Sequence, residues 1–313
     1  MPLYAPDYYK AFKCTADKCR HNCCIGWEID IDAGSLDFYK SVTGRLGERL
    51  KENIVSGDTS YFKLKKDRRC PFLNSNNLCD IITELGEHRL CQICADHPRF
   101  RNIFENRTEI GLGLCCEAAA ELILTRREKT EIICLDSQDI IQPYDENPLI
   151  NLRNKLFAAT QNREENFEER TKRVLSLVGA NLPNKTMQEW ADVFLKLERL
   201  DDNWTKRLSL LNDSCDAYTD LFAGEQWQLF FEQLLIYFIF RHLPDGLFDG
   251  LIPERVAFAV LSCEIISAIL AAEFNNTGVT DISFAIDTCR MYSAEIEYSD
   301  SNIATLLEIL KNG

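Results

Sequence analysis

The sequence predicts a mainly α-helical protein with a small, irregular α+β region at its N-terminus that is rich in cysteine. Eleven of the 14 cysteines lie at or before Cys134, among short and mixed elements. Beyond residue 148, apolar residues recur at helical spacing almost to the end of the chain. We therefore expect a cysteine-rich domain over residues 1–135, a linker over 136–148 and a helical domain over 149–313.

The first 60 residues contain one expected strand and one expected helix. Apolar and polar residues alternate in "IGWEIDIDAG", residues 25–34, as they do in a half-buried strand. Asp32 and Ser35 are typical start signals for the helix that we expect over Leu36–Ile54.

The rest of the cysteine-rich region is expected to contain two turns and a helix. The segment "RCPFLNSNNLCDI" has strand–turn–strand character around Asn74–Asn77. The segment "NIFENRTEIGLGL" resembles a hairpin with a polar turn at Glu105–Thr108. The segment "CEAAAELILTRREK", residues 116–129, begins a helix with strong helix formers and has a basic C-terminal end.

The second half is expected to be helical almost throughout, after a polar boundary at Asp136–Pro148. Thr186 and Glu189 match a capping box at the start of one helix. The apolar faces of that helix and of the last helix are formed by Met187, Trp190, Phe194 and Leu197, and by Ile303, Leu306, Leu307 and Leu310. These stripes indicate core packing and imply no cofactor.

Composition and charge exclude some classes of protein. Hydrophobic residues make up 46% of the chain and charged residues 27%, which is typical of a soluble globular protein. The net charge of −14 argues against nucleic acid as the main partner, because phosphate binding needs a clustered positive surface. Residues 1–130 carry 20 Lys and Arg against 19 Asp and Glu, whereas residues 131–313 carry 15 against 30. This asymmetry predicts two regions with different roles, the second of them acidic.

The sequence predicts a cytoplasmic protein with no membrane span. The start "MPLYAPDYYK" lacks the apolar stretch of a secretory signal. The two most apolar stretches, Phe230–Phe240 and Ala257–Ala272, fall short of the roughly 20 uninterrupted apolar residues that a span requires. We expect both to be buried helices.

The clustered cysteines then point to a metal site in the irregular N-terminal region. A reducing compartment disfavours disulfides, so clustered thiols there indicate metal ligands or catalytic groups. Zinc and an iron–sulfur cluster both take four thiolates, and the spacing alone leaves the choice between them open. The three late cysteines, Cys215, Cys263 and Cys289, lie in helical patterns and are expected to be small buried apolar residues.

Spacing excludes two kinds of site and leaves one histidine open. The cysteine loop of ordinary radical enzymes that use S-adenosylmethionine would need a cysteine at position 26, which is Gly26. The "GLG" at 111–113 lacks the third glycine of a nucleotide-binding fingerprint. His97 could be a metal ligand, although a surface or hydrogen-bonding role is favoured.

Four segments of the chain carry a family resemblance: "FKCTADKCRHNCCIGWEIDID", "CPFLNSNNLCDIITELGEHRLCQICADHPR", "GLGLCCEAAAELIL" and "YSAEIEYSDSN". Together, and in this order over nearly the whole chain, they resemble the flagellin lysine-N-methylase family. The N-terminal part also resembles a broader cysteine-cluster family described as zinc- or iron-chelating.

The resemblance implies transfer of a methyl group from S-adenosylmethionine to lysine side chains of flagellin, with a [4Fe–4S] cluster as the required metal centre and Zn²⁺ as the alternative. The resemblance implies eight metal ligands, at positions where the family also has cysteine: Cys14, Cys19, Cys23, Cys24, Cys70, Cys79, Cys94 and Cys116. Cys91 and Cys115 stand where relatives more often carry serine, which makes them weaker ligand candidates.

The C-terminal segment offers candidate catalytic groups. Lysine must lose its proton before it can attack, and a carboxylate or tyrosine could accept that proton or guide it to water. Glu295 and Glu297 are the carboxylate candidates, with Tyr292 and Ser299 as hydrogen-bonding supports. The alternative for this segment is a helix end whose carboxylates face solvent. Relatives have arginine and histidine where this chain has Ala294 and Tyr298, which argues against any role that rests on a charge at position 294 or an imidazole at position 298.

A second hypothesis comes from a different class of protein. The chain could be a non-enzymatic zinc or iron–sulfur protein, in which the cysteines form a structural knot and the helical domain binds a partner.

Overall fold

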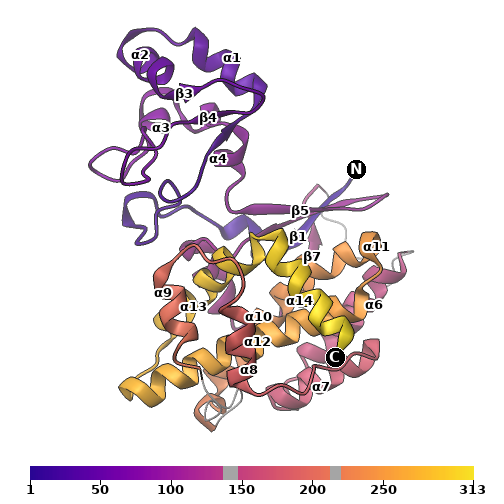
Figure 1. Cartoon of the computed structure of the whole chain (residues 1–313). Coiled ribbons are helices and arrows are strands. Elements are labelled where there is room, and N and C mark those ends of the chain that lie inside the picture. Colours follow the sequence, from indigo (N-terminus) through magenta and orange to yellow (C-terminus); the bar gives the residue numbers. More distant parts are fainter. Residues whose placement is uncertain (137–146, 212–219) are drawn as a thin grey trace. The chain divides into compact units, whose positions relative to one another are not determined.

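The computed structural model describes residues 1–136, 147–211 and 220–313, and these form two compact units. The cysteine-rich unit comprises Lys13–Phe100, and the helical unit comprises Met1–Phe12 together with Arg101–Gly313. Figure 1 traces both along the chain. Residues 101–135, with Cys115, Cys116 and Cys134, therefore group with the helical unit rather than with the cysteine-rich unit. Most of the expected linker lies outside the described residues, so the boundary at 136–148 stays a prediction.

The cysteine-rich unit is built from short elements around a small sheet. Three strands pair antiparallel in the order β2-β4-β3. They are β2 Asp30–Ile31, β3 Ile54–Val55 and β4 Ser60–Phe62, and the helices are α1 Ala33–Ser41, α2 Gly44–Asn53, α3 Asp80–Leu85 and α4 Gln92–Asp96. Short 3₁₀ turns lie at Ala16–Lys18 and Glu87–Arg89. The expected strand over residues 25–34 is reduced to Asp30–Ile31.

The single helix expected over Leu36–Ile54 is wrong, because the chain breaks into α1 and α2. Val42 and Thr43 adopt extended backbone conformations between the helices, and Gly44 has a positive φ of 74°. The carbonyl oxygen of Val42 lies 2.1 Å from where a Cβ at Gly47 would stand, so only glycine permits this turn. The start signal is confirmed, since the Asp32 side chain accepts a hydrogen bond from the backbone N–H of Ser35.

The expected turn at Asn74–Asn77 is confirmed, but its flanking strands shrink to a single bridge between Leu73 and Cys79. The Asn74 side chain accepts hydrogen bonds from the backbone N–H groups of Asn76 and Leu78. An asparagine that satisfies its own turn in this way needs no long ladder on either side.

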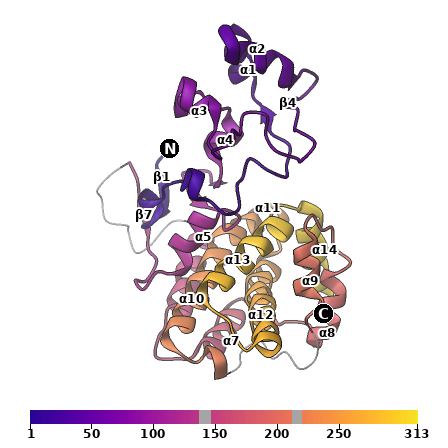
Figure 2. The same ribbon diagram turned by 90° about the vertical axis from the view of Figure 1, so that its left-hand side faces the viewer.

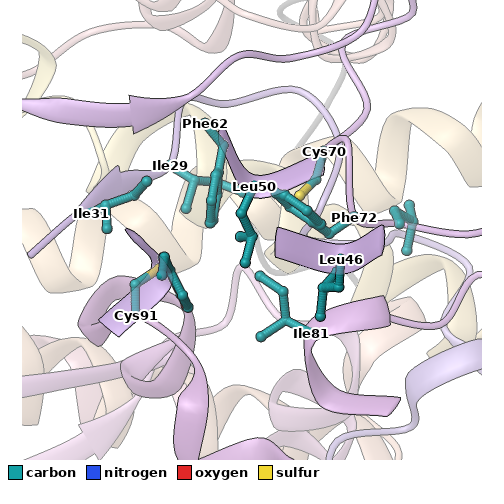
Figure 3. Close-up of a cluster of buried hydrophobic side chains, with 11 residues drawn as sticks. Ile29, Ile31, Leu46, Leu50, Phe62, Cys70, Phe72, Ile81 and Cys91 are labelled. Carbon is teal, nitrogen blue, oxygen red and sulfur yellow. The ribbon is translucent and has the colours of Figure 1, made fainter. Parts of the chain in front are cut away.

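A compact apolar core holds this unit together (Figure 3). Side chains from both sheet and helices meet there, and two of the buried members are cysteines. The core consists of Ile29, Ile31, Tyr39, Leu46, Leu50, Phe62, Cys70, Phe72, Leu73, Ile81 and Cys91.

The helical unit begins with a four-stranded sheet in the order β5-β6-β1-β7. Its strands are β1 Leu3–Pro6, β5 Arg99–Ile103, β6 Thr108–Leu112 and β7 Ile132–Cys134. The expected hairpin is confirmed, with the N–H of Phe104 donating to the carbonyl of Arg107 across the turn. The first strand pairs parallel with β6, Leu3 opposite Thr108, and antiparallel with β7.

Helices form the rest of this unit, with α12 in the middle of the bundle beside α10 (Figure 2). It also packs against α7, α13 and α14. The helices are α5 Glu117–Leu124, α6 Pro148–Thr160, α7 Phe167–Val178, α8 Met187–Phe194, α9 Asp202–Leu208, α10 Glu225–His242, α11 Gly246–Asp249, α12 Ile252–Thr277, α13 Ile282–Tyr292 and α14 Asp300–Asn312. Short 3₁₀ turns lie at Tyr9–Ala11, Asp220–Phe222 and Leu243–Asp245, and one π-helical segment, Ser293–Glu297, follows α13. The capping box of Thr186 and Glu189 is confirmed at α8.

Both apolar stretches are buried core helices, as predicted. The first lies in α10 and the second in α12. In the described residues α12 is the one helix whose length and composition would allow it to cross a membrane, and 89% of its apolar window is buried inside the unit. Cys263 and Cys289 are buried as predicted, whereas Cys215 lies outside the described residues.

Candidate functional site

The predicted cysteine ligands divide between the two units. Seven of them belong to the cysteine-rich unit, and Cys116 belongs to the helical unit, where it is the N-cap residue of α5. Cys14 and Cys23 are exposed, and Cys19 is half-buried with its thiol directed at the carbonyl of His21. Four further predicted ligands, Cys24, Cys70, Cys79 and Cys94, lie in or against the core of their unit.

Those four thiols and Cys91 form one group, which we call the thiol cluster. The thiols of Cys70 and Cys79 both act electrostatically on Cys24, and those of Cys24 and Cys70 act on Cys94. The Cys91 thiol hydrogen-bonds to Cys94, and Figure 3 shows Cys70 and Cys91 in the core. Within the described residues, no three His, Cys, Asp or Glu side chains stand arranged to hold a metal ion. The thiol cluster therefore brings sulfur donor atoms into one core, but it does not form a coordination shell in this structure.

Backbone N–H groups point at two of these sulfurs. The thiol of Cys70 accepts hydrogen bonds from the N–H groups of Phe72 and Leu73, two and three residues further on. The thiol of Cys79 does the same with Ile81 and Ile82 at the start of α3. Such N–H groups stabilise a thiolate, so each turn presents its sulfur as a potential anionic ligand.

Burial opposes that ionisation when no cation is present. Burial raises the pKa of Cys70 to about 11 and also raises the pKa of Cys79, and neighbouring thiols add to both shifts. A metal cation would reverse this, because coordination deprotonates a thiol outright. The residue types of the cluster suit thiolate ligands, and the metal centre itself stays a prediction.

His97 lies near the cluster in sequence, three residues after Cys94. Its ring packs against Trp27 at 5.6 Å between centroids. Burial lowers the pKa of His97 to about 4, so the imidazole is neutral at physiological pH. The Nε2 atom is buried and has no hydrogen-bond partner among the described residues. A neutral ring nitrogen without a partner leaves the ligand hypothesis for His97 open.

The predicted catalytic segment is buried, so the alternative of solvent-facing carboxylates is wrong. Glu295 and Glu297 are only 3% and 5% exposed. Both lie on the π-helical segment, a rare conformation that is frequent at functional sites.

Three of the four predicted catalytic residues have clear structural contacts. The two carboxylate oxygens of Glu295 accept hydrogen bonds from the backbone N–H groups of Leu200 and Asp201. The Tyr292 hydroxyl pairs with Ser262 of α12 at 2.7 Å. Ser299 caps α14 by accepting from the N–H of Asn302. These contacts fix the ends of elements, and the catalytic roles stay predictions.

Glu297 stands in a different environment, which we call the Glu297 site. Its Oε1 atom lies 2.6 Å from Nε2 of His242 and 3.3 Å from Nε of Arg241. Its Oε2 atom accepts a hydrogen bond of 2.9 Å from the Tyr237 hydroxyl. The three partners all come from α10, so one carboxylate ties the π-helical segment to that helix.

Electrostatics keep this carboxylate ionised. Burial alone would raise the pKa of Glu297, but the charge of Arg241 and the hydrogen bond with His242 lower it to about 2. Burial also lowers the pKa of His242, against the raising effect of the hydrogen bond with Glu297. The site therefore contains a buried carboxylate and a buried guanidinium, with Tyr237 and His242 as further hydrogen-bonding groups.

Sequence reasoning missed Tyr237, Arg241 and His242. They lie about 55–60 residues before Glu297, and no local spacing connects the two segments. One signal was present, because "FRH" places two polar side chains at the end of an otherwise apolar helix. Buried polar groups of this kind need partners elsewhere in the fold.

An outer layer adjoins the Glu297 site. The Arg241 guanidinium lies 4.7 Å from the ring centre of Tyr298, a residue that is 49% exposed. The Tyr298 hydroxyl in turn hydrogen-bonds to the thiol of Cys115. Cys115, a weak candidate from sequence, thus adjoins the buried site.

Comparison with known proteins assigns the helical half of the chain to a protein family. Residues 99–313 match the family model of the FliB lysine N-methylase C-terminal domain, which covers the Glu297 site and both Cys115 and Cys116. The chain belongs to this family. No solved structure matches it.

Curated relatives are distant members. The lysine-N-methylases of Salmonella typhimurium and Salmonella choleraesuis are 27% and 25% identical over 159 residues, which is 48% of this chain and 39% of theirs. The flagellar biosynthetic protein FliU of Salmonella muenchen is 25% identical over 126 residues, which is 38% of this chain and 75% of its own length. The matched region thus spans well under half the length of the lysine-N-methylases.

Proposed function

We propose that this protein methylates lysine side chains of flagellin in the cytoplasm, with S-adenosylmethionine as methyl donor and a [4Fe–4S] cluster held by cysteines. The family match over residues 99–313 carries the proposal. The relatives named lysine-N-methylase and flagellar biosynthetic protein support the reaction and the flagellar substrate.

The thiol cluster is the part of the chain suited to hold the metal centre. Four of its members are ligands that the family resemblance predicts, and Cys70 and Cys79 already receive the backbone N–H groups that stabilise thiolates. Cys24, Cys70, Cys79 and Cys94 would hold the [4Fe–4S] cluster, which when bound would supply a binding site for the amino and carboxylate groups of S-adenosylmethionine. Cys14, Cys19, Cys23 and Cys116 remain further ligand candidates.

The helical unit supplies the electrostatics for a cationic substrate. Residues 131–313 carry twice as many acidic as basic side chains, so their field attracts a lysine ammonium and a sulfonium. The pKa of about 2 makes Glu297 a weak base for an ammonium group, because a general base works best with a pKa near the operating pH. We assign Glu297 to holding negative charge in place, and the lysine proton leaves to water.

Methylation is tested with purified flagellin. The anaerobically purified protein is incubated with flagellin and S-adenosylmethionine under reducing conditions, and mass spectrometry follows mass gains of one or more methyl groups on lysine. We expect methylated lysines that are absent without the methyl donor. The variant E297Q should lose most activity, while E225Q, which changes an exposed carboxylate, should keep it. Unmethylated flagellin in the presence of an intact metal centre would refute the reaction.

The metal centre has its own test. An iron–sulfur protein is brown, absorbs broadly near ~400 nm and yields iron and sulfide on analysis. Cys79→Ser should lose this absorption, whereas Cys263→Ala, which changes a buried cysteine of α12, should keep it. A colourless protein with stoichiometric zinc would instead favour a non-enzymatic protein with a structural cysteine knot.

A further inference from the structure

The turn that contains Cys115 and Cys116 is hydrogen-bonded to the side chain of Tyr237. The N–H of Cys116 closes the turn on the carbonyl of Gly113, and the chain then enters α5. Inside the turn, the backbone N–H of Leu114 donates to the Tyr237 hydroxyl at 3.2 Å. Leu114 is fully buried, so this side-chain oxygen satisfies a backbone group that water cannot reach.

The Tyr237 hydroxyl has a fixed orientation. A phenol has one O–H to donate and lone pairs with which to accept. Tyr237 accepts from Leu114 and from Nη1 of Arg241, the latter at 2.9 Å, so its own proton is directed at Glu297. Any loss of the Glu297 carboxylate would free this hydroxyl to turn, and the bond to Leu114 would weaken.

A second route connects the same carboxylate to the same turn. Nε of Arg241 pairs with Glu297, and the Arg241 guanidinium lies against the ring of Tyr298. Tyr298 then hydrogen-bonds to the thiol of Cys115. The backbone route through Leu114 and the side-chain route through Tyr298 thus both end at the cysteine pair.

We infer that Tyr237 is a positioning residue for the Cys115–Cys116 turn, and that Glu297 acts on this turn through Tyr237 rather than on a substrate proton. This deepens the proposed function, on which it rests, because that function makes Cys116 of this turn a candidate metal ligand. It adds Tyr237 and Arg241 to the site.

The inference is tested by removing one hydroxyl. Tyr237→Phe keeps the ring but removes the acceptor of Leu114, and Tyr292→Phe is the matched control because it removes an equally buried hydroxyl that bonds to Ser262. Iodoacetamide labelling followed by mass spectrometry reports the alkylation rate of Cys115, with Cys134 as internal reference. Hydrogen–deuterium exchange reports the amide of Leu114. Neither measurement needs flagellin or a methyl donor, so both can succeed or fail independently of methylation.

We expect Y237F to speed alkylation of Cys115 and exchange of Leu114 about tenfold, the effect of losing one buried hydrogen bond. Y292F should change neither. Unchanged rates in a folded Y237F, or equal increases in both variants, would overturn the inference. Should Y237F not fold, exchange in the native protein decides: the Leu114 amide must then be as protected as the amides of α10, and fast exchange there would refute the role of Tyr237.

Discussion

The two units of this protein solve the problem of stability in different ways. The cysteine-rich unit has no α-helix longer than ten residues among its described elements, and its core includes two cysteines. The helical unit contains α10 with 18 residues and α12 with 26, both packed on nearly all sides. A unit below 100 residues with such short elements buries little apolar area, so it needs an additional stabilising device.

The polar groups buried in each unit differ in the same sense. The helical unit buries Glu109 with Arg107 and Arg153, and Glu232 with Arg170. In the described part of the cysteine-rich unit, Ser60 is the one buried polar residue. The core of this unit contains thiols instead of ion pairs. Buried ion pairs stabilise a fold without a bound ligand, whereas buried thiols stabilise it strongly only when they bind a metal. This contrast predicts that the two units respond to different perturbations.

Metal removal should produce the largest difference between them. A structural metal bound by thiolates contributes on the order of 10 kcal/mol to folding, so chelation should unfold the cysteine-rich unit. The helical unit should keep its structure. Hydrogen–deuterium exchange resolved by peptide measures both units in one sample, and restoring the metal is the control. Equal protection of the cysteine-rich unit with and without metal would show that its apolar core suffices.

Breaking a buried ion pair should have the opposite selectivity. Glu232 accepts from Arg163 and from Arg170, whose side chains are 37% and 2% exposed. Glu232→Gln leaves a buried guanidinium without its counter-charge, which costs about 3–5 kcal/mol of unfolding free energy in the helical unit. Denaturant unfolding measures the loss.

The matched control is Glu225→Gln. Its partner Arg127 lies 3.3 Å away, and both side chains are more than 70% exposed. Such a pair contributes under about 1 kcal/mol. Similar losses in both variants would mean that burial of the pair does not decide its contribution.

The contrast between the units also explains what the sequence could predict. Local signals worked in both units, because the Asp32 cap, the capping box at Thr186 and the hairpin at Glu105–Thr108 each depend on neighbours a few residues apart. Long apolar runs identified α10 and α12, since a run that is apolar on all sides must be buried. The break before Gly44 was missed, because a helix periodicity persists across it and only the approach of Val42 to Gly47 makes the turn specific.

The Glu297 site shows the limit of sequence reasoning. The carboxylate was predicted, but its partners come from α10, and only the packed fold brings them together. The same holds for β1, whose parallel partner β6 lies about 100 residues away. In the thiol cluster, the residue types were visible in the sequence, but the inclusion of Cys91 follows from its burial in the core.

Acid should weaken the helical unit through the Glu297 site. The folded pKa of Glu297, about 2, lies below its ordinary value of 4.5, so its contribution is complete above 4.5 and disappears as the pH falls through 2. The pKa of His242 is also lowered, and its contribution likewise decreases on acidification below about 6.5. The Glu297 shift corresponds to about 3 kcal/mol of unfolding free energy.

Glu297→Gln should flatten the pH dependence of the unfolding free energy between pH 5 and pH 2, as measured by denaturant titrations at each pH. The control variant Glu308→Gln, which changes an exposed carboxylate, should not. An unchanged slope in E297Q would assign the acid sensitivity to other groups.

The smallest effect concerns a single carboxylate in the cysteine-rich unit. Asp32 accepts from the N–H of Ser35 at the start of α1 and from the N–H of Gln92 at the start of α4, at 2.9 and 2.8 Å. Since one side chain caps two helices, Asp32→Ala should cost about 1–2 kcal/mol. Asp37→Ala, an exposed change inside α1, is the control and should cost less. Exchange of amides in α4 is the decisive measurement, because α4 lies 60 residues away in sequence and Asp32 bonds directly to its first N–H group. If α1 loosens and α4 does not, the bond from Gln92 to Asp32 contributes nothing to the stability of α4.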